Sequence, residues 1–184
     1  ETATQVEPEI RVDANKNMLI RKRTIKPKKN SVTITIAMAS PPLEAIIANW
    51  NKTVGPDDTV FCLGDFCFGT KDNIPYYTRQ LNGRKILIRG NHDRTKSLYI
   101  EAGFQEVMGE YVLHPHHSGF NRIILFTHKP RIGMDKFTAN IHGHIHDQLL
   151  DPAIFELENY FNVSVENINY TPIELQEIIR RMGW

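Results

Sequence analysis

The chain has 184 residues, enough for one domain with a buried core and an appendage, and too few for two domains of ordinary size. Its residues are 41% hydrophobic and 23% charged, and no stretch approaches the roughly 18 to 20 apolar residues that cross a membrane. We therefore expect no membrane partner. With no basic and apolar leader at its start, the chain is expected in the cytoplasm, or in a virion if it derives from a phage.

Residues 1–30 differ in composition from the rest of the chain. The formal net charge is only +1, but eight Lys and Arg residues lie between Arg11 and Asn30, against one acidic residue, Asp13. A run this basic can bind nucleic acid or an acidic partner, whereas a solvated extension is more common. We predict a basic N-terminal extension, and nucleic acid is the most weakly supported of the partners.

The same segment has the pattern of a β-hairpin. Apolar runs at residues 9–12 and 18–25 flank a polar stretch at 13–17, and such a stretch is typical of a turn between paired strands. A linker containing proline follows at 26–30. The compact domain is therefore predicted to span residues 31–184.

Within the compact domain, segments with strand and helix periodicity alternate, which is typical of α/β layering. Strands are predicted at 31–39, 59–63, 85–89, 110–114, 122–127, 138–141 and 160–165, and helices at 41–54, 74–81, 96–102 and from 172 onward. The last helix is predicted to begin at a capping box formed by Thr171 and Glu174.

Four of the apolar strands are followed at once by side chains that bind metal ions. The segments are Gly64-Asp65, Gly90-Asn91-His92-Asp93, Thr127-His128 and Gly143-His144-Ile145-His146. One such segment alone is more often a turn or a hydrogen-bonded histidine. All four in this order are very improbable by accident, and residues beyond successive strand ends converge on one site in open α/β sheets. We therefore predict one metal site.

These segments resemble the later motifs of the calcineurin-like metallophosphoesterases, most closely the small bacterial and phage-type members. The resemblance extends to residues 49–51, 57–59 and 161–165, and it covers about three-quarters of the chain, from Leu43 onward. It implies an α/β (α+β) fold with two packed mixed β-sheets flanked by helices, which is the metallophosphoesterase-like β-sandwich core. It also implies a two-metal site at the strand ends.

Carried over position by position, the resemblance implies metal ligands at Asp65, Asn91, His128, His144 and His146. Asp65 would bridge two ions. Asn91, His128 and His144 would bind the second ion, and His146 would bind the first. Carboxylate, amide and imidazole donors suit divalent transition metals, with Mn²⁺ leading and Fe, Zn²⁺ and Ni²⁺ as alternatives. Two such ions activate a water and hold a phosphate for in-line attack.

His92 and Asp93 are the catalytic residues that the resemblance implies. His92 would face the leaving group as general acid, and Asp93 would orient or charge its imidazole. Arg94 is a candidate for binding the substrate phosphate, with a solvent-exposed role as an equal alternative.

The family's first motif, an Asp-x-His after the first strand, is not found. The strand predicted at 31–39 ends without a ligand, and the degenerate match at residues 13–15 is more typical of a turn. The first metal would keep Asp65 and His146, whereas stable sites use three or more protein ligands. We therefore predict that the first site is incomplete and the second complete.

Four aromatic residues, Phe66, Phe68, Tyr76 and Tyr77, are predicted to pack between the sheet and the helices. Stacking on nucleobases is less favoured for them, because no basic groove is interleaved with these rings. His142 precedes the last of the four segments, and it either supports the metal ligands or faces solvent at its strand end.

The leading hypothesis for function is a metal-dependent phosphoric ester hydrolase. It would cleave a phosphomonoester or phosphodiester with metal-activated water, so a phosphate ester is the expected partner. The alternative is a catalytically impaired family member that acts as a structural or interaction protein, for example in a phage particle. The complete second site favours the enzyme, and the missing first motif and the basic extension favour the alternative.

Overall fold

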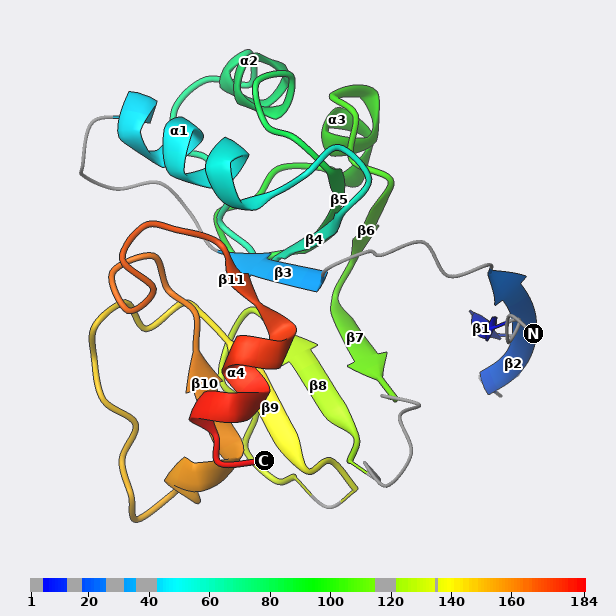
Figure 1. The fold of residues 1–184 in the computed structure, drawn as a ribbon, viewed down its shortest axis with the longest axis vertical. Helices are drawn as coiled ribbons and strands as arrows, with labels where there is room; N and C mark the ends of the chain where they lie inside the picture. Colours follow the sequence, from blue (N-terminus) through cyan, green and yellow to red (C-terminus); the bar gives the residue numbers. More distant parts are fainter. Residues whose placement is uncertain (1–4, 13–17, 26–31, 36–42, 115–121, 135) are drawn as a thin grey trace. The chain divides into compact units, whose positions relative to one another are not determined.

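The computed structural model describes residues 5–12, 18–25, 32–35, 43–114, 122–134 and 136–184 (Figure 1). The chain divides into two compact units, Glu1–Asn30 and Ser31–Trp184. Across the described ranges, no helix combines the length and the apolar character that crossing a membrane requires.

The first unit contains a two-stranded hairpin. Strand β1 (Gln5–Val12) pairs antiparallel along its whole length with strand β2 (Met18–Ile25). The pairing confirms the predicted hairpin. The predicted turn at 13–17 and the linker at 26–30 lie outside the described residues.

The second unit contains two β-sheets, of which the larger has the strand order β11-β3-β4-β5-β6. Strands β3 (Val32–Thr35), β4 (Thr59–Cys62), β5 (Arg84–Ile88) and β6 (Glu106–Met108) run parallel, and β11 (Ile173–Glu174) pairs antiparallel with β3. Helices α1 (Leu43–Thr53), α2 (Asn73–Thr78) and α3 (Lys96–Glu101) connect the successive parallel strands (Figure 1).

The smaller sheet has the strand order β10-β9-β8-β7. Strand β7 (Glu110–Leu113) is antiparallel to β8 (Ile124–Thr127), whereas β8, β9 (Ala139–His142) and β10 (Tyr160–Asn162) run parallel. A 3₁₀ turn η1 (Leu157–Asn159) precedes β10, and helix α4 (Leu175–Arg181) follows β11. A single residue, Gly109, separates β6 from β7, so the chain passes directly from one sheet into the other.

One face of the larger sheet is covered by helices. Because side chains alternate along a strand, Val60 of β4 and Leu87 of β5 point to the same side. There they form a buried cluster with Trp50 of α1, Ile74 of α2 and Tyr99 of α3. Burial of each large apolar side chain stabilises the fold by about 1.5–3 kcal/mol, so this cluster fixes the helices on the sheet.

The opposite face of the larger sheet packs against the smaller sheet. Phe61 of β4 and Ile88 of β5 share a second buried cluster with Phe126 of β8, Ile141 of β9 and Ile178 of α4. The rings of Phe61 and Phe126 meet edge to face, with centroids 5.0 Å apart. The second unit is therefore an α/β fold with two packed sheets flanked by helices, as predicted.

Several parts of the secondary structure differ from the prediction. The capping box is wrong: the hydroxyl of Thr171 donates to the Asn169 carbonyl, and Glu174 precedes α4 without a side-chain cap. The physical reason is that residues 173–174 pair with β3, which extends the backbone where a helix start was predicted. Strand β6 and the turn η1 were not predicted. Of the strand predicted at 31–39, only 32–35 lies within the described residues.

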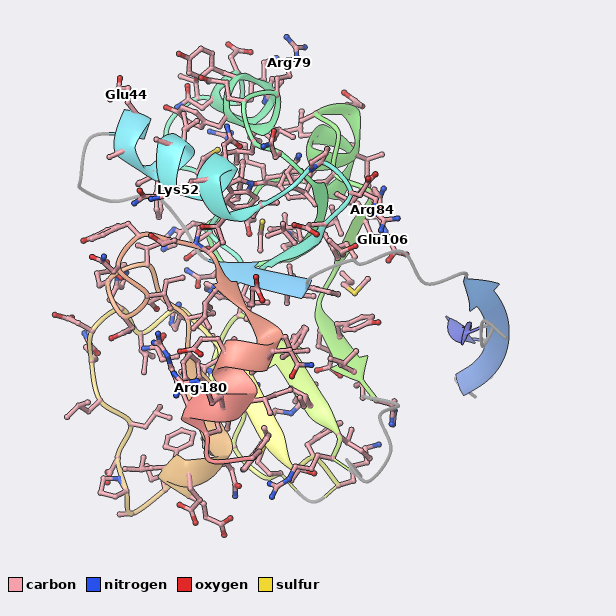
Figure 2. All side chains as sticks on the ribbon, in the orientation of Figure 1. Glu44, Lys52, Arg79, Arg84, Glu106 and Arg180 are labelled. Atoms are coloured by element: carbon pink, nitrogen blue, oxygen red, sulfur yellow. The ribbon has the colours of Figure 1, made fainter. Side chains whose placement is uncertain are left out.

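Exposed charged side chains on the helices include Glu44 and Lys52 of α1 and Arg180 of α4 (Figure 2). In α1, Glu44 lies in the first turn and Lys52 in the last, which complements the helix dipole. In α4, hydrogen bonds from Arg180 and Arg181 lower the pKa of Glu177 to about 2.

Candidate metal centre

Strands from both sheets deliver predicted ligands to one place. Asp65 and Asn91 follow β4 and β5 of the larger sheet, and His128 and His144 follow β8 and β9 of the smaller one. Parallel neighbours end on the same side of a sheet, so each pair of ligands lies together. One ligand atom from each of Asp65, His128 and His144 lies within 4.8 Å of the other two. Two sheets thus contribute to one cluster of metal-binding side chains.

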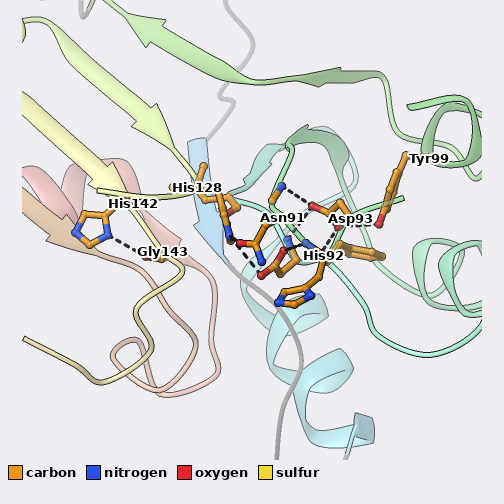
Figure 3. Close-up of polar contacts among 11 residues, drawn as sticks. Asn91, His92, Asp93, Tyr99, His128, His142 and Gly143 are labelled. Carbon is orange, nitrogen blue, oxygen red and sulfur yellow. Dashed lines mark hydrogen bonds and ion pairs between the residues drawn. The ribbon is translucent and has the colours of Figure 1, made fainter. Parts of the chain in front are cut away.

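The imidazole of His128 is oriented by its hydrogen-bond partners (Figure 3). Its Nδ1 lies 2.8 Å from the Leu63 carbonyl oxygen, which can only accept, so Nδ1 carries the proton. Its Nε2 lies 2.9 Å from Asn91 Oδ1 and 3.4 Å from Asp65 Oδ2. With a neutral ring and the amide oriented as in the structure, Nε2 and the two oxygen atoms face one another, and all three are acceptors. A metal ion among them would be bound by all three.

Gly64 and Gly90 allow the turns that carry the ligands to approach closely. A Cβ atom on Gly64 would overlap Nδ1 of His128, and one on Gly90 would overlap Oδ1 of Asp65. Gly64 also has a φ of +91°, a conformation that only glycine adopts readily. Glycine at both positions is therefore a condition for the observed placement of Asp65 and His128.

The carboxylate of Asp93 is buried and ties two of these turns together (Figure 3). Its Oδ2 accepts from the backbone N–H groups of Asp65 and Gly90, at 2.8 and 2.7 Å. Its Oδ1 accepts from the N–H of Phe66 at 3.0 Å and from the hydroxyl of Tyr99 at 2.7 Å. Asp93 therefore positions the ligand-bearing turns after β4 and β5.

The predicted pairing of Asp93 with the imidazole of His92 is not among these hydrogen bonds. Buried backbone N–H groups need acceptors. Three such groups and the hydroxyl of Tyr99 donate to the two carboxylate oxygens of Asp93. His92 itself is exposed. Its backbone N–H donates to Asp65 Oδ1 at 2.9 Å, and its ring lies beside Phe68 with centroids 5.4 Å apart. His92 therefore lies at the edge of the cluster, where its imidazole is open to solvent.

His144 is half-buried and close to His128, with ring centroids 4.8 Å apart. Burial lowers the pKa of His144, the neighbouring His128 and Lys129 lower it further, and Asp65 acts in the opposite direction. A metal ion binds the neutral imidazole, and a lowered pKa favours that form.

His146 is exposed and contacts a side chain outside this cluster. Its Nδ1 is 3.0 Å from Glu166 Oε1, and among the described residues the grouped metal-binding side chains do not include it. Two amides, those of Asn162 and Asn167, donate to its backbone carbonyl at 2.7 Å each. Glu166 was not predicted as a site residue, because no motif or spacing in the sequence marks it.

The structure also describes two further residues named in the sequence analysis, Arg94 and His142. Arg94 is exposed, and its Nη2 donates to the Gly69 carbonyl at 2.6 Å. His142 is fully buried and burial lowers its pKa to about 4, so the alternative that it faces solvent is wrong. The stretches where a first motif was sought, 13–15 and 37–40, lie outside the described residues.

The molecule is thus an α/β protein with two packed sheets and a candidate metal centre built from both. It belongs to the same family as the uncharacterized protein MJ1445 of Methanocaldococcus jannaschii, to which it is 32% identical over 148 residues, covering 74% of this chain and 73% of that protein. The Gene 66 protein of Mycobacterium phage D29 is 29% identical over 127 residues, covering 55% of this chain and 64% of that protein.

A solved structure shares the fold. The protein of unknown function AQ665 from Aquifex aeolicus superposes with a TM-score of 0.66 at 24% sequence identity, covering 83% of this chain and 99% of that chain. No family model matches the chain.

Proposed function

We propose that this chain is a metal-dependent phosphoesterase. The observation that carries the proposal is the orientation of His128, whose Nε2 is directed at Asn91 Oδ1 and Asp65 Oδ2 while Nδ1 is bonded to the Leu63 carbonyl. A backbone carbonyl on the far nitrogen is the kind of partner that orients histidines that bind metals. The resemblance of the four strand-end segments to the calcineurin-like metallophosphoesterases supports the same function.

The residues that would hold the ion are Asp65, Asn91, His128 and His144. Their carboxylate, amide and imidazole donors fit a divalent transition metal, with Mn²⁺ as the leading candidate. When bound, such an ion neutralises negative charge on a phosphate and makes a bound water more acidic. This chemistry suits the hydrolysis of a phosphate ester, which is the proposed substrate.

The chain's own residues have separate tasks in this proposal. Asp93 fixes the turns that carry the ligands through its four hydrogen bonds. His92 is exposed beside Asp65 and is the residue that would donate a proton to the departing oxygen. Loss of such a proton donor costs about 10²- to 10⁴-fold in rate.

Elemental analysis and an ester assay test the proposal together. Protein purified without chelators should contain a divalent metal, and it should hydrolyse bis(p-nitrophenyl) phosphate or p-nitrophenyl phosphate when Mn²⁺ is added. His92→Ala should lose most turnover and keep the metal, whereas Asp65→Ala should lose both. His114→Ala, at an exposed histidine outside the cluster, is the control and should change neither. If the wild-type protein hydrolyses no ester above the His92→Ala background, the hypothesis that the chain is an enzyme is refuted.

A second candidate is a structural or interaction protein that has kept the fold, for example one associated with a phage. It is supported by His146, whose Nδ1 contacts Glu166, and by the separate basic unit at residues 1–30. A protein that retains a metal, melts at a higher temperature with it and hydrolyses no ester would fit this candidate.

A further inference from the structure

Phe68 leaves an aromatic ring open to solvent beside the candidate metal centre. Phe68 is 49% exposed, whereas Phe66 in the same turn is 4% exposed. Phe66 packs edge to face against Phe104, with centroids 4.9 Å apart, as its predicted role between sheet and helices requires. The same prediction for Phe68 is wrong, because Phe66 already fills the core at this turn.

The turn that carries Phe68 is held by side-chain hydrogen bonds. Asn73 Nδ2 donates to the Phe68 carbonyl at 2.8 Å, and Arg94 Nη2 donates to the Gly69 carbonyl at 2.6 Å. Gly69 has a φ of +94°, and a Cβ atom there would lie 2.6 Å from Asn73 Nδ2. The ring of Phe68 is therefore presented to solvent by a turn with fixed backbone contacts.

The open ring adjoins the residue proposed to protonate the leaving group. The rings of Phe68 and His92 have centroids 5.4 Å apart, and the backbone N–H of His92 is bonded to Asp65. A phosphate ester at the cluster with its leaving oxygen toward His92 brings the leaving group to the side of Phe68. Large exposed aromatic rings beside polar sites commonly serve recognition, because they offer contact area with few rotatable bonds.

We propose that Phe68 is a stacking platform that selects phosphate esters bearing a planar aromatic group, either an aryl group or a nucleobase. The proposal rests on the proposed function, because it needs a phosphate held at the cluster. Stacking on an aromatic side chain depends on the flat face of the ring and tolerates differences among rings. Phe68 therefore gives a preference for planar groups without selecting one base.

Binding of non-hydrolysable phosphonates to the Mn²⁺-loaded protein tests this inference, because leaving-group reactivity does not enter. Calorimetric titration should show phenylphosphonate binding about tenfold more tightly than methylphosphonate, the size expected for one stacked ring. An adenine-bearing alkylphosphonate tests the nucleobase in the same way. Tighter binding of this compound than of phenylphosphonate indicates a nucleobase, and weaker binding indicates an aryl group.

Substitutions at Phe68 separate stacking from other effects. Phe68→Leu should bring the ratio of the two affinities close to one while methylphosphonate binds as before, and Phe68→Trp should keep the ratio. Fluorescence of the new tryptophan should respond to phenylphosphonate and not to methylphosphonate. Tyr76→Leu is the matched control, because Tyr76 is 60% exposed on α2 and its ring packs with Tyr77.

The inference is overturned if wild-type protein binds both phosphonates equally or binds neither, or if Phe68→Leu keeps the ratio. Failure of the proposed function has a different signature. In that case the ratio and its dependence on Phe68 persist, while no ester is hydrolysed.

Discussion

Two groups of predicted metal ligands differ in how the fold holds them. The side chains of Asp65 and His128 are 10% and 6% exposed, and backbone groups orient both. The side chain of His146 is 61% exposed, and its partner Glu166 is 25% exposed. Interactions between exposed groups are screened by water and contribute little, whereas buried donors with fixed partners keep their geometry.

Residues that the sequence marks alike as metal ligands can therefore differ in how firmly the structure holds them. The cluster of Asp65, Asn91, His128 and His144 is arranged before an ion binds, so we expect it to bind tightly. The side chains of His146 and Glu166 are joined by one contact of 3.0 Å, and that of His146 is largely exposed. We therefore expect one tightly held ion at the cluster and at most weak binding at the pair.

The largest effect is expected from Asp93→Ala, which removes the support of the cluster. It leaves buried N–H groups and the Tyr99 hydroxyl without an acceptor, and we expect a loss of about 3–5 kcal/mol in the free energy of unfolding. Urea unfolding in the presence of EDTA measures it. Asp72→Ala, at an exposed residue without a side-chain cap bond, should stay within about 0.5 kcal/mol. Equal effects of the two changes would contradict the role given to Asp93.

The second test compares ligands from the two groups. His128→Ala should weaken Mn²⁺ binding by about 100-fold or more, because changes in supporting residues alone cost 10- to 100-fold. His146→Ala should weaken the tightly held ion by less than about tenfold. Titration of free Mn²⁺ followed by electron paramagnetic resonance gives both values. If His146→Ala has the larger effect, the ranking of the two groups is reversed.

A third test concerns the close approach of the turns at Gly64. A methyl group there collides with His128, so Gly64→Ala should lower Mn²⁺ affinity by about 10- to 100-fold. Gly109→Ala is the matched control, because a Cβ atom at Gly109 meets no atom within 4 Å. Calorimetry on both variants checks the contrast. Unchanged Mn²⁺ affinity in Gly64→Ala would show that the turns can move apart without weakening metal binding.

The smallest effect is expected at Glu166. Glu166→Gln keeps the shape of the side chain and removes its charge, so only weak binding at His146 should suffer, by about tenfold or less. The tightly held ion should be unaffected. A second, weaker phase in the same Mn²⁺ titration provides the measurement, and a change in the first phase would place Glu166 in the cluster.

The fold and much of the cluster could be predicted because strand ends carry a local signal. Asp65, His128 and His144 each follow an apolar strand, and parallel pairing brings such ends together. The partners of Asp93 could not be predicted, because backbone N–H groups have no signature in a sequence. The pairing of residues 173–174 with β3 was missed because a tertiary contact overrode a local capping pattern.

The exposure of Phe68 and the contact of Glu166 with His146 were missed for a different reason. Phe66 and Phe68 are two residues apart in one turn, and only the packing around Phe104 decides which of them is buried. Glu166 reaches His146 across a loop that no periodic pattern describes. Such contacts depend on how loops fold over a finished core.

The division of the four cluster residues between the sheets has a mechanical consequence. Asp65 and Asn91 belong to the larger sheet, and His128 and His144 belong to the smaller one. An ion shared among them would be a cross-link between segments far apart in the chain, and it would limit the sliding of one sheet over the other. Binding would then join the unfolding of the two sheets into one transition, much as a disulfide across the sandwich would.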